Sequence, residues 1–226
     1  MNRGTALCIM MLALVALPVA AQETPITAPQ PTVPEVFTLT GSFTRIAYNN
    51  EGFATMGYRM ANEELGKEWM LLDAGVTLRK GTKNYTLKRE HFSVKTPDGT
   101  IIPLATNQEY KGGNLRALNH RAKVMRQSIN YFPIEADQPC ALSFFAETGS
   151  ANMAWDEVEV TYLRACVGRL YFRVPGGIQL GQHWLLIKLA NSELQVPFRI
   201  ISEEDVKKLE KSWEDLKKQL DASYGK

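Results

Sequence analysis

The stretch WMLLDAGVTL, residues 69–78, is apolar apart from Gly75 and the polar side chains of Asp73 and Thr77. A nearly continuous apolar run of this length predicts a central β-strand that is covered on both faces. An isolated carboxylate is costly to bury, so Asp73 must be paired, capped or placed at a bend. We therefore expect a structural role for Asp73 rather than a catalytic one.

Runs in which apolar and polar residues alternate lie on both sides of this central strand. They cover residues 37–43, 157–162, 169–174 and 194–200. A period of two predicts strands with one face in a core and the other in water. Pro197 has no amide hydrogen to donate, and this places the last of these strands at the edge of a sheet.

Turn-forming residues separate the runs, as at 49–52, 97–99, 175–177 and 190–193. Many short strands with regular turns and no crossover helices between them favour a sandwich over a doubly wound α/β fold. The predicted fold class is therefore mainly β: an Ig-like antiparallel β-sandwich over residues 36–201, with one inserted helix and a C-terminal amphipathic helix.

The inserted helix is expected at residues 114–127, after Gly112-Gly113 and with Asn114 as its N-cap. Its apolar stripe recurs at spacings of three and four, at Leu115, Leu118, Ala122, Met125 and Ile129. The other faces carry four cations, Arg116, Arg121, Lys123 and Arg126, and no acidic residue lies between positions 114 and 129. Either acids elsewhere, such as Glu135, Asp137, Asp156 or Glu157, neutralise this patch, or the patch binds anionic envelope groups such as lipid phosphates, acidic polysaccharide or an acidic partner.

The C-terminal helix is expected at residues 203–222, where Ser202 and Asp205 resemble a capping box. Its stripe consists of Val206, Leu209, Trp213, Leu216 and Leu220. Two heptads are short for a coiled coil. We therefore expect this stripe to dock on the sandwich of a monomer, and the alternative is a coiled-coil-like dimer.

The N-terminal segment has the features of an exported protein. Residues 1–21 combine Arg3, an apolar stretch from Ala6 to Leu17 and small residues before a cut after Ala21, which predicts a signal peptide; the alternative is an uncleaved anchor. Residues 22–35 carry four prolines among polar residues and predict a disordered linker. No later segment is apolar for long enough to predict a membrane span after cleavage.

Cleavage would leave two cysteines, Cys140 and Cys166, in a compartment that permits disulfides. Residues 141–147 and 157–164 read as strands, and if these strands pair as a hairpin the two cysteines meet at its open end. We expect a Cys140–Cys166 bridge, with two buried thiols as the alternative. The scattered His91, His120 and His183 do not complete a recognisable metal site, so no metal and no cofactor are expected.

The charge balance and the motifs limit the possible functions. The chain has 26 basic and 24 acidic residues, too small an excess for a dedicated nucleic-acid binder. It lacks G-x-S-x-G, H-E-x-x-H, a phosphate-binding glycine loop and C-x-x-C. His91 and His183 are expected to be structural or exposed. We therefore expect no catalytic residues; the alternative is an envelope enzyme with a site around Tyr110–Arg126.

Four segments carry a resemblance to a known group of proteins. LRALNHRAKVMRQSINYFP (115–133), RACVGRLYFRVPGGIQLGQHWL (164–185) and VPFRI (196–200) look like an uncharacterised family of exported bacterial proteins. KNYTLKREHFSVKTPDGTIIPL (83–104) is similar to the core of telokin-like, immunoglobulin-like sandwiches. The resemblance implies a sandwich that serves binding or structure in the cell envelope, and it brings no ligand or activity with it.

Together these patterns predict an exported, periplasmic protein, with an extracellular location as the alternative. Its expected role is non-catalytic: it binds an envelope protein or an anionic envelope component. A purely structural module without a ligand is a further alternative, because sandwiches serve all of these roles.

Overall fold

The structure is a computed structural model that describes residues 43–146 and 153–223. The expected signal peptide, the expected linker and the start of the expected sandwich at residues 36–42 lie outside the described residues. Of the first alternating run, only Phe43 is described, and it precedes strand β1.

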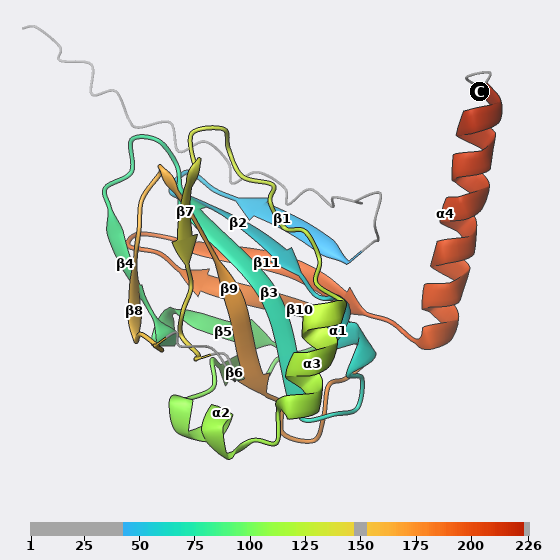
Figure 1. The fold of residues 1–226 in the computed structure, drawn as a ribbon, viewed down its shortest axis with the longest axis horizontal. Helices are drawn as coiled ribbons and strands as arrows, with labels where there is room; N and C mark the ends of the chain where they lie inside the picture. Colours follow the sequence, from blue (N-terminus) through green and yellow to red (C-terminus); the bar gives the residue numbers. More distant parts are fainter. Residues whose placement is uncertain (1–42, 147–152, 224–226) are drawn as a thin grey trace, which may run out of the picture.

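Two sheets packed face to face form the body of the protein (Figure 1). The five-stranded sheet has the order β1 (Thr44–Tyr48), β2 (Gly52–Gly57), β3 (Trp69–Leu78), β9 (Arg164–Arg173) and β7 (Gln138–Ala141). The four-stranded sheet has the order β11 (Glu193–Ile200), β10 (Gly181–Lys188), β5 (Phe92–Lys95) and β6 (Ile101–Pro103). The predicted mainly β, sandwich-like fold is confirmed.

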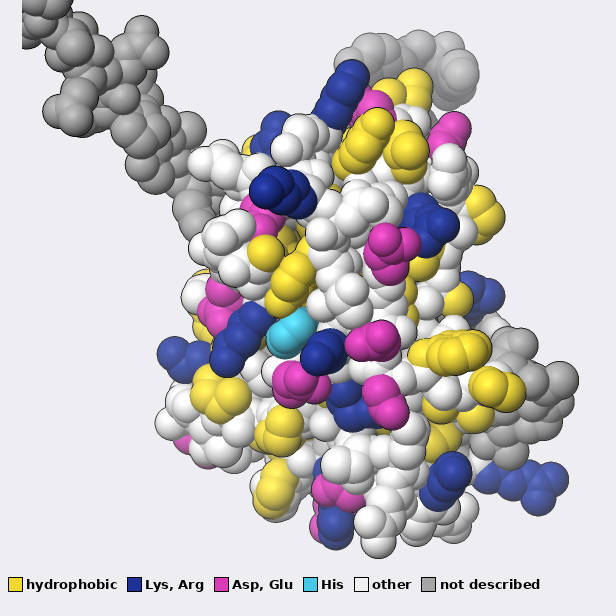
Figure 2. Space-filling view, turned by 90° about the vertical axis from the view of Figure 1, so that its left-hand side faces the viewer, with side chains coloured by type: hydrophobic (Ala, Val, Ile, Leu, Met, Phe, Trp, Pro, Cys, Tyr) yellow, Lys and Arg dark blue, Asp and Glu magenta, His cyan; other side chains and the backbone are white. Residues whose placement is uncertain are grey.

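A short two-stranded ladder of β4 (Tyr85–Lys88) and β8 (Glu157–Val160) closes one side of the sandwich. Its inward side chains Leu87 and Val160 are fully buried, and a 3-10 turn, η1 (Arg89–His91), connects β4 to β5. The surface on this side mixes acidic and basic side chains, with a histidine among them (Figure 2).

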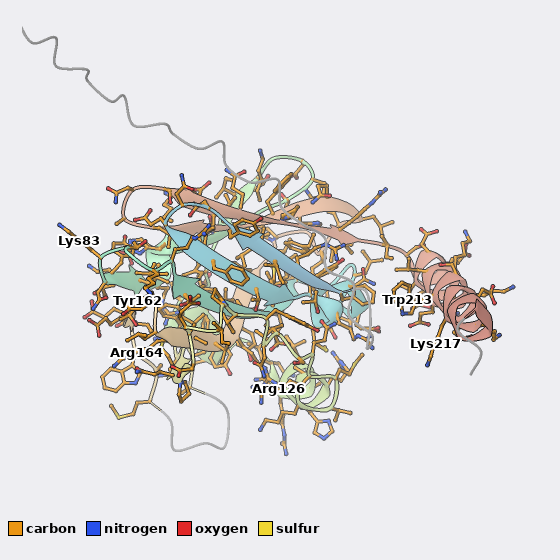
Figure 3. The ribbon with its side chains drawn as sticks, turned by 90° about the horizontal axis from the view of Figure 1, so that it is seen from above. Lys83, Arg126, Tyr162, Arg164, Trp213 and Lys217 are labelled. Carbon is orange, nitrogen blue, oxygen red and sulfur yellow. A yellow bond between two sulfur atoms is a disulfide. The ribbon has the colours of Figure 1, made fainter. Side chains whose placement is uncertain are left out.

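Strand β3 occupies the predicted residues and is the central strand of the five-stranded sheet. Residues 70–78 are all buried, and only Trp69 is partly exposed. Seen from above, the four-stranded sheet, the five-stranded sheet and a helical layer lie one beneath another (Figure 3). β3 is therefore covered on both faces, as its apolar run requires.

The edge position of the last strand follows the prediction from its proline. β11 pairs with β10 alone among the described strands, and Pro197 is the register partner of Trp184. The missing amide hydrogen of Pro197 is tolerated because no described strand lies beyond this edge.

In the described part of the chain, four α-helices accompany the sheets: α1 (Arg59–Glu63), α2 (Asn107–Gly112), α3 (Arg116–Val124) and α4 (Glu203–Ser223). The inserted helix is shorter than the predicted 114–127, and its N-cap is Leu115, without a side-chain hydrogen bond, rather than Asn114. The sequence prediction missed α2, which begins with a capping box between Thr106 and Glu109. The apolar stripe continues past the end of α3 to Ile129, but the chain there is not helical, and Thr55 Oγ1 donates to the Ile129 carbonyl at 2.7 Å.

Helix α4 begins where it was predicted, and Ser202 caps it by accepting from the Asp205 amide at 3.2 Å. The prediction that α4 docks on the sandwich was wrong. The helix extends away from the body (Figures 1 and 3), and Trp213 is 38% exposed. Val206 packs against the core, whereas Gln195 and Arg199 on the outer face of the neighbouring β11 are exposed; the side chains of Leu216 and Leu220 lie outside the described residues.

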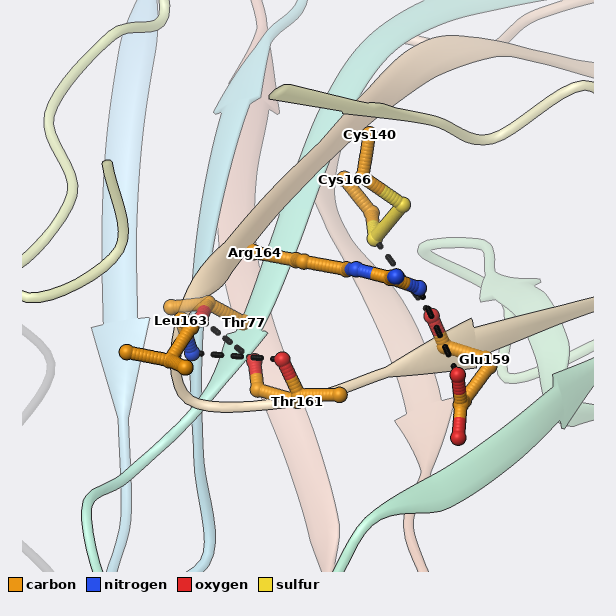
Figure 4. The surroundings of a disulfide bond; sticks show 7 residues. All are labelled: Thr77, Cys140, Glu159, Thr161, Leu163, Arg164 and Cys166. Carbon is orange, nitrogen blue, oxygen red and sulfur yellow. Dashed lines mark hydrogen bonds and ion pairs between the residues drawn. A yellow bond between two sulfur atoms is a disulfide. The ribbon is translucent and has the colours of Figure 1, made fainter. Parts of the chain in front are cut away.

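The Cys140–Cys166 disulfide is present in the structure, as predicted (Figure 4). The expected hairpin around it was wrong. The cysteines are register partners in the parallel pair β7–β9, whereas β8 pairs with β4. The pairing of β8 with β4 places Glu157 opposite Lys88, and the attraction between these unlike charges favours the β4–β8 ladder.

Within residues 43–146 and 153–223, no helix combines the length and the apolar character needed to cross a bilayer.

Candidate binding site

An open cleft of about 580 Å³ lies on the outer face of the five-stranded sheet, beside the C-terminal end of α3. Three segments form its walls: residues 126–130 after α3, residues 141–145 after β7, and residues 167–171 of β9. Asp73 and Tyr110 complete the lining. A volume of this size is typical of small-molecule sites.

A buried ion pair lies within the lining of the cleft. Asp73 and Arg169 are register partners on β3 and β9, and Arg169 Nε donates to Asp73 Oδ1 at 3.4 Å. Arg169 Nη2 also donates to the Ala122 carbonyl near the end of α3, at 3.1 Å, where the helix dipole favours a cation. The charge of Asp73 is thus offset by Arg169, and the prediction that a buried Asp73 would be paired is confirmed.

Three aromatic rings form one wall of the cleft. Tyr110, Phe145 and Tyr171 contact one another with ring centroids 4.8–5.0 Å apart. Asn119 of α3 links two of them, because it accepts from the Tyr171 hydroxyl at 2.7 Å and donates to the Tyr110 hydroxyl at 3.3 Å. All three rings are at least nine-tenths buried, so the wall is rigid and its shape is set before any ligand arrives.

The four cations predicted on the inserted helix have different environments. Arg121 forms an ion pair with the buried Glu64, which also pairs with Lys67 at 3.0 Å. Arg126 lines the cleft and is exposed. Arg116 and Lys123 are exposed on α3, and among the described residues neither they nor Arg126 forms an ion pair. Three of the four charges are thus uncompensated within the described part of the chain.

The acids expected to neutralise this helix do not do so among the described contacts. Glu135, Asp137 and Glu157 form no ion pair with α3, and Asp156 pairs with Arg89 at 3.7 Å. Glu64, which the sequence did not single out, is the acid that reaches α3. It lies next to α1, brought beneath α3 by the fold rather than by proximity in the chain.

The histidines lie away from the cleft. His183 is fully buried between the sheets, stacks on Phe198, and its Nδ1 lies 3.1 Å from the Gly181 carbonyl oxygen. His91 stacks on Tyr85. Burial lowers the pKa of both imidazoles because it disfavours their charged forms. His120 is exposed on α3.

The described lining contains groups that suit ligand binding, and among them we recognise no arrangement typical of a catalytic site. Its described members include the serines Ser128 and Ser143 but no histidine, and the carboxylate of Asp73 is already paired with Arg169. In the described residues, no three His, Cys, Asp or Glu side chains are placed to hold a metal ion. The arrangement combines one exposed arginine, a neutral buried ion pair and an aromatic wall.

Several residues of this site were missed by the sequence analysis, namely Asn119, Phe145 and Arg169. Alternation along β9 predicted that Arg169 points into water, and it gave no sign that α3 covers this face of the sheet. The polar residue inside the apolar run of β3 was the one available signal, since a buried Asp73 requires a cationic or hydrogen-bonding partner.

No family model, curated protein or solved structure matches the chain.

Proposed function

We propose that this is an exported, non-catalytic binding protein of the bacterial cell envelope, and that α3 with its adjoining cleft binds an anionic envelope component. The observation that supports this most directly is the set of three exposed cations, Arg116, Lys123 and Arg126, without acidic partners among the described residues. Arginine suits such a role because its planar guanidinium binds carboxylate or phosphate through two hydrogen bonds.

The disulfide supports export, because such bonds persist in oxidising compartments such as the periplasm. The signal-peptide pattern of residues 1–21 points to the same compartment. The resemblance to exported, immunoglobulin-like proteins is part of this proposal and agrees with the sandwich-like arrangement of the sheets.

The proposal is tested with the mature chain, residues 22–226, on anionic vesicles and on an acidic polysaccharide at low salt. A variant carrying Arg116→Ser, Lys123→Ser and Arg126→Ser should lose retention on the matrix that serves as ligand. Retention of the unmodified protein should fall steeply as salt rises, because the Debye length shortens from about 10 Å at 0.1 M to about 3 Å at 1 M.

The matched control removes three exposed lysines far from α3: Lys80→Ser, Lys83→Ser and Lys95→Ser. Lys83 lies at the end of the body opposite α4, well away from Arg126 (Figure 3). This control changes the net charge by the same amount but leaves the α3 surface intact, so it should be retained like the unmodified protein. An equal loss of retention in both triple variants would show that general charge, rather than the α3 surface, is responsible.

A further inference from the structure

The cleft has a charge pattern that restricts its ligand more narrowly than the surface of α3 does. Its described charged lining consists of Asp73, Arg126 and Arg169. Because Asp73 and Arg169 pair with each other, the excess charge is the single positive charge of Arg126. A dianion such as phosphate would meet the buried carboxylate of Asp73 with only one unpaired cation to offset its two charges, whereas a monoanion is matched.

Apolar side chains form one part of the remaining lining, beside uncharged polar side chains. Ile129, Leu142 and Phe145 come from the two segments that flank the cleft, and Val167 comes from β9. Such a surface stabilises the apolar part of a ligand by removing it from water. The cleft thus offers one anion-binding group next to an apolar wall, which fits a ligand with both characters.

The wall that follows β7 is held in place from two sides. The disulfide fixes Cys140 to β9 immediately before Ala141 enters the lining, and the Leu142 amide donates to the Val167 carbonyl at 2.9 Å. Leu142 can approach β9 closely because position 168 is glycine; a Cβ there would lie 2.3 Å from the Leu142 carbonyl oxygen. The apolar wall is therefore preorganised, which reduces the entropy lost on binding.

From these three observations we infer that the cleft binds a monocarboxylate with a compact apolar body. The carboxylate pairs with the guanidinium of Arg126, and the apolar body packs against Ile129, Leu142 and Phe145. This inference rests on the proposed function and names the chemical class of ligand for the cleft. The carboxylate can belong to a free acid or to the C-terminus of a peptide.

The test measures binding of small probes to the mature chain by titration calorimetry or ligand-observed NMR. Benzoate represents a free acid, N-acetyl-leucine represents a peptide terminus, and inorganic phosphate represents a dianion. Benzamide is the neutral analogue of benzoate. At least one of the two carboxylates should bind saturably. The neutral amide of that carboxylate, benzamide or N-acetyl-leucinamide, should bind at least about tenfold more weakly, and phosphate should also bind more weakly than that carboxylate. The tighter of the two carboxylates identifies the source of the ligand.

Two arginine variants provide the matched comparison. Arg126→Gln should weaken carboxylate binding at least about tenfold. Arg199→Gln removes an equal charge from the exposed face of β11, in the other sheet, and should leave binding within about twofold. Ala141→Trp should block the cleft without changing any charge, and thermal unfolding checks that each variant is folded.

Absence of saturable carboxylate binding, equal binding of the bound carboxylate and its neutral amide, tighter binding of phosphate, or equal effects of the two arginine variants would each overturn the inference. Its failure is distinguishable from that of the proposed function. Retention on vesicles or polysaccharide without binding of either carboxylate would overturn the inference alone. Carboxylate binding without retention would overturn the envelope ligand and keep the cleft as a small-molecule site.

Discussion

Removing the Cys140–Cys166 bridge should lower the free energy of unfolding by about 3.5 kcal/mol. The cysteines are separated by 26 residues, and the chain-entropy relation for a loop of that length gives about 12 cal/mol/K, or about 3.5 kcal/mol at 25 °C. The hydrogen bonds from the Gln138 amide to the Leu163 carbonyl and from the Leu142 amide to the Val167 carbonyl do not depend on the bridge, so the folded sheet should persist. The loss then arises in the unfolded chain, which gains freedom. For a body of about 160 residues, it corresponds to a melting temperature about 10 °C lower.

The suitable variant is Cys140→Ser with Cys166→Ala, because Cys166 is fully buried and a serine there would bury a hydroxyl. Urea unfolding followed by tryptophan fluorescence gives the free energy of the oxidised protein, the reduced protein and the variant. The reduced protein and the variant should agree within about 1 kcal/mol. A loss below about 1 kcal/mol in both would refute the loop-entropy argument. Two free thiols in unfolded, non-reduced protein would refute the bridge itself.

Three further perturbations test the described packing. Asp73→Asn should lower the free energy of unfolding in urea by about 3–5 kcal/mol, because it removes the carboxylate that pairs with the buried Arg169. Replacing both residues, by Leu and Met, should recover most of that loss. No recovery would argue against the ion pair as the cause. Burial lowers the pKa of His183 below its ordinary value of 6.5, so this imidazole binds a proton more readily in the unfolded chain than in the folded one. The stability that the neutral, buried His183 contributes is therefore present above pH 6.5 and is lost as the pH falls. His183→Phe should therefore reduce the loss of stability between pH 7 and pH 5, and an unchanged pH profile would exclude this histidine as its source. Deleting residues 214–226 should change the melting temperature by less than about 2 °C in calorimetry, since Val206 and Trp213 are retained; a fall of more than about 5 °C would reveal a contact of the removed segment with the body.

The sequence predicted those parts of the fold that depend on local patterns. β3 and β11 lie within a residue of their predicted bounds, because apolar periodicity reports directly which faces are buried. α4 begins at the predicted residue because the cap at Ser202 is a local interaction. The bridge followed from the pairing of the last two cysteines, but its register did not, because β7 lies parallel to β9 and takes no part in the expected hairpin.

The cleft depends on contacts between residues far apart in the chain, and for that reason the sequence did not reveal it. Asp73 and Arg169 are 96 residues apart, and Arg121 and Glu64 are 57 apart. Local periodicity cannot tell which strand will lie beside β3 or which face α3 will cover. It could indicate only that Asp73 needs a partner and that α3 carries unmatched charge.

β3 lies in the sheet between β2, which is close to it in the chain, and β9, which is synthesised much later, and this order matters for the biosynthesis of the protein. Only the short helix α1 separates β2 from β3 in the chain, whereas β9 begins only at Arg164. Until β9 has been made, β3 has an open hydrogen-bonding edge along a run that is apolar on both faces, the type of segment that recruits other chains. Nascent or proteolysed chains that end before Arg164 should therefore collect in aggregates, and the cell must shield this segment until the later strand arrives.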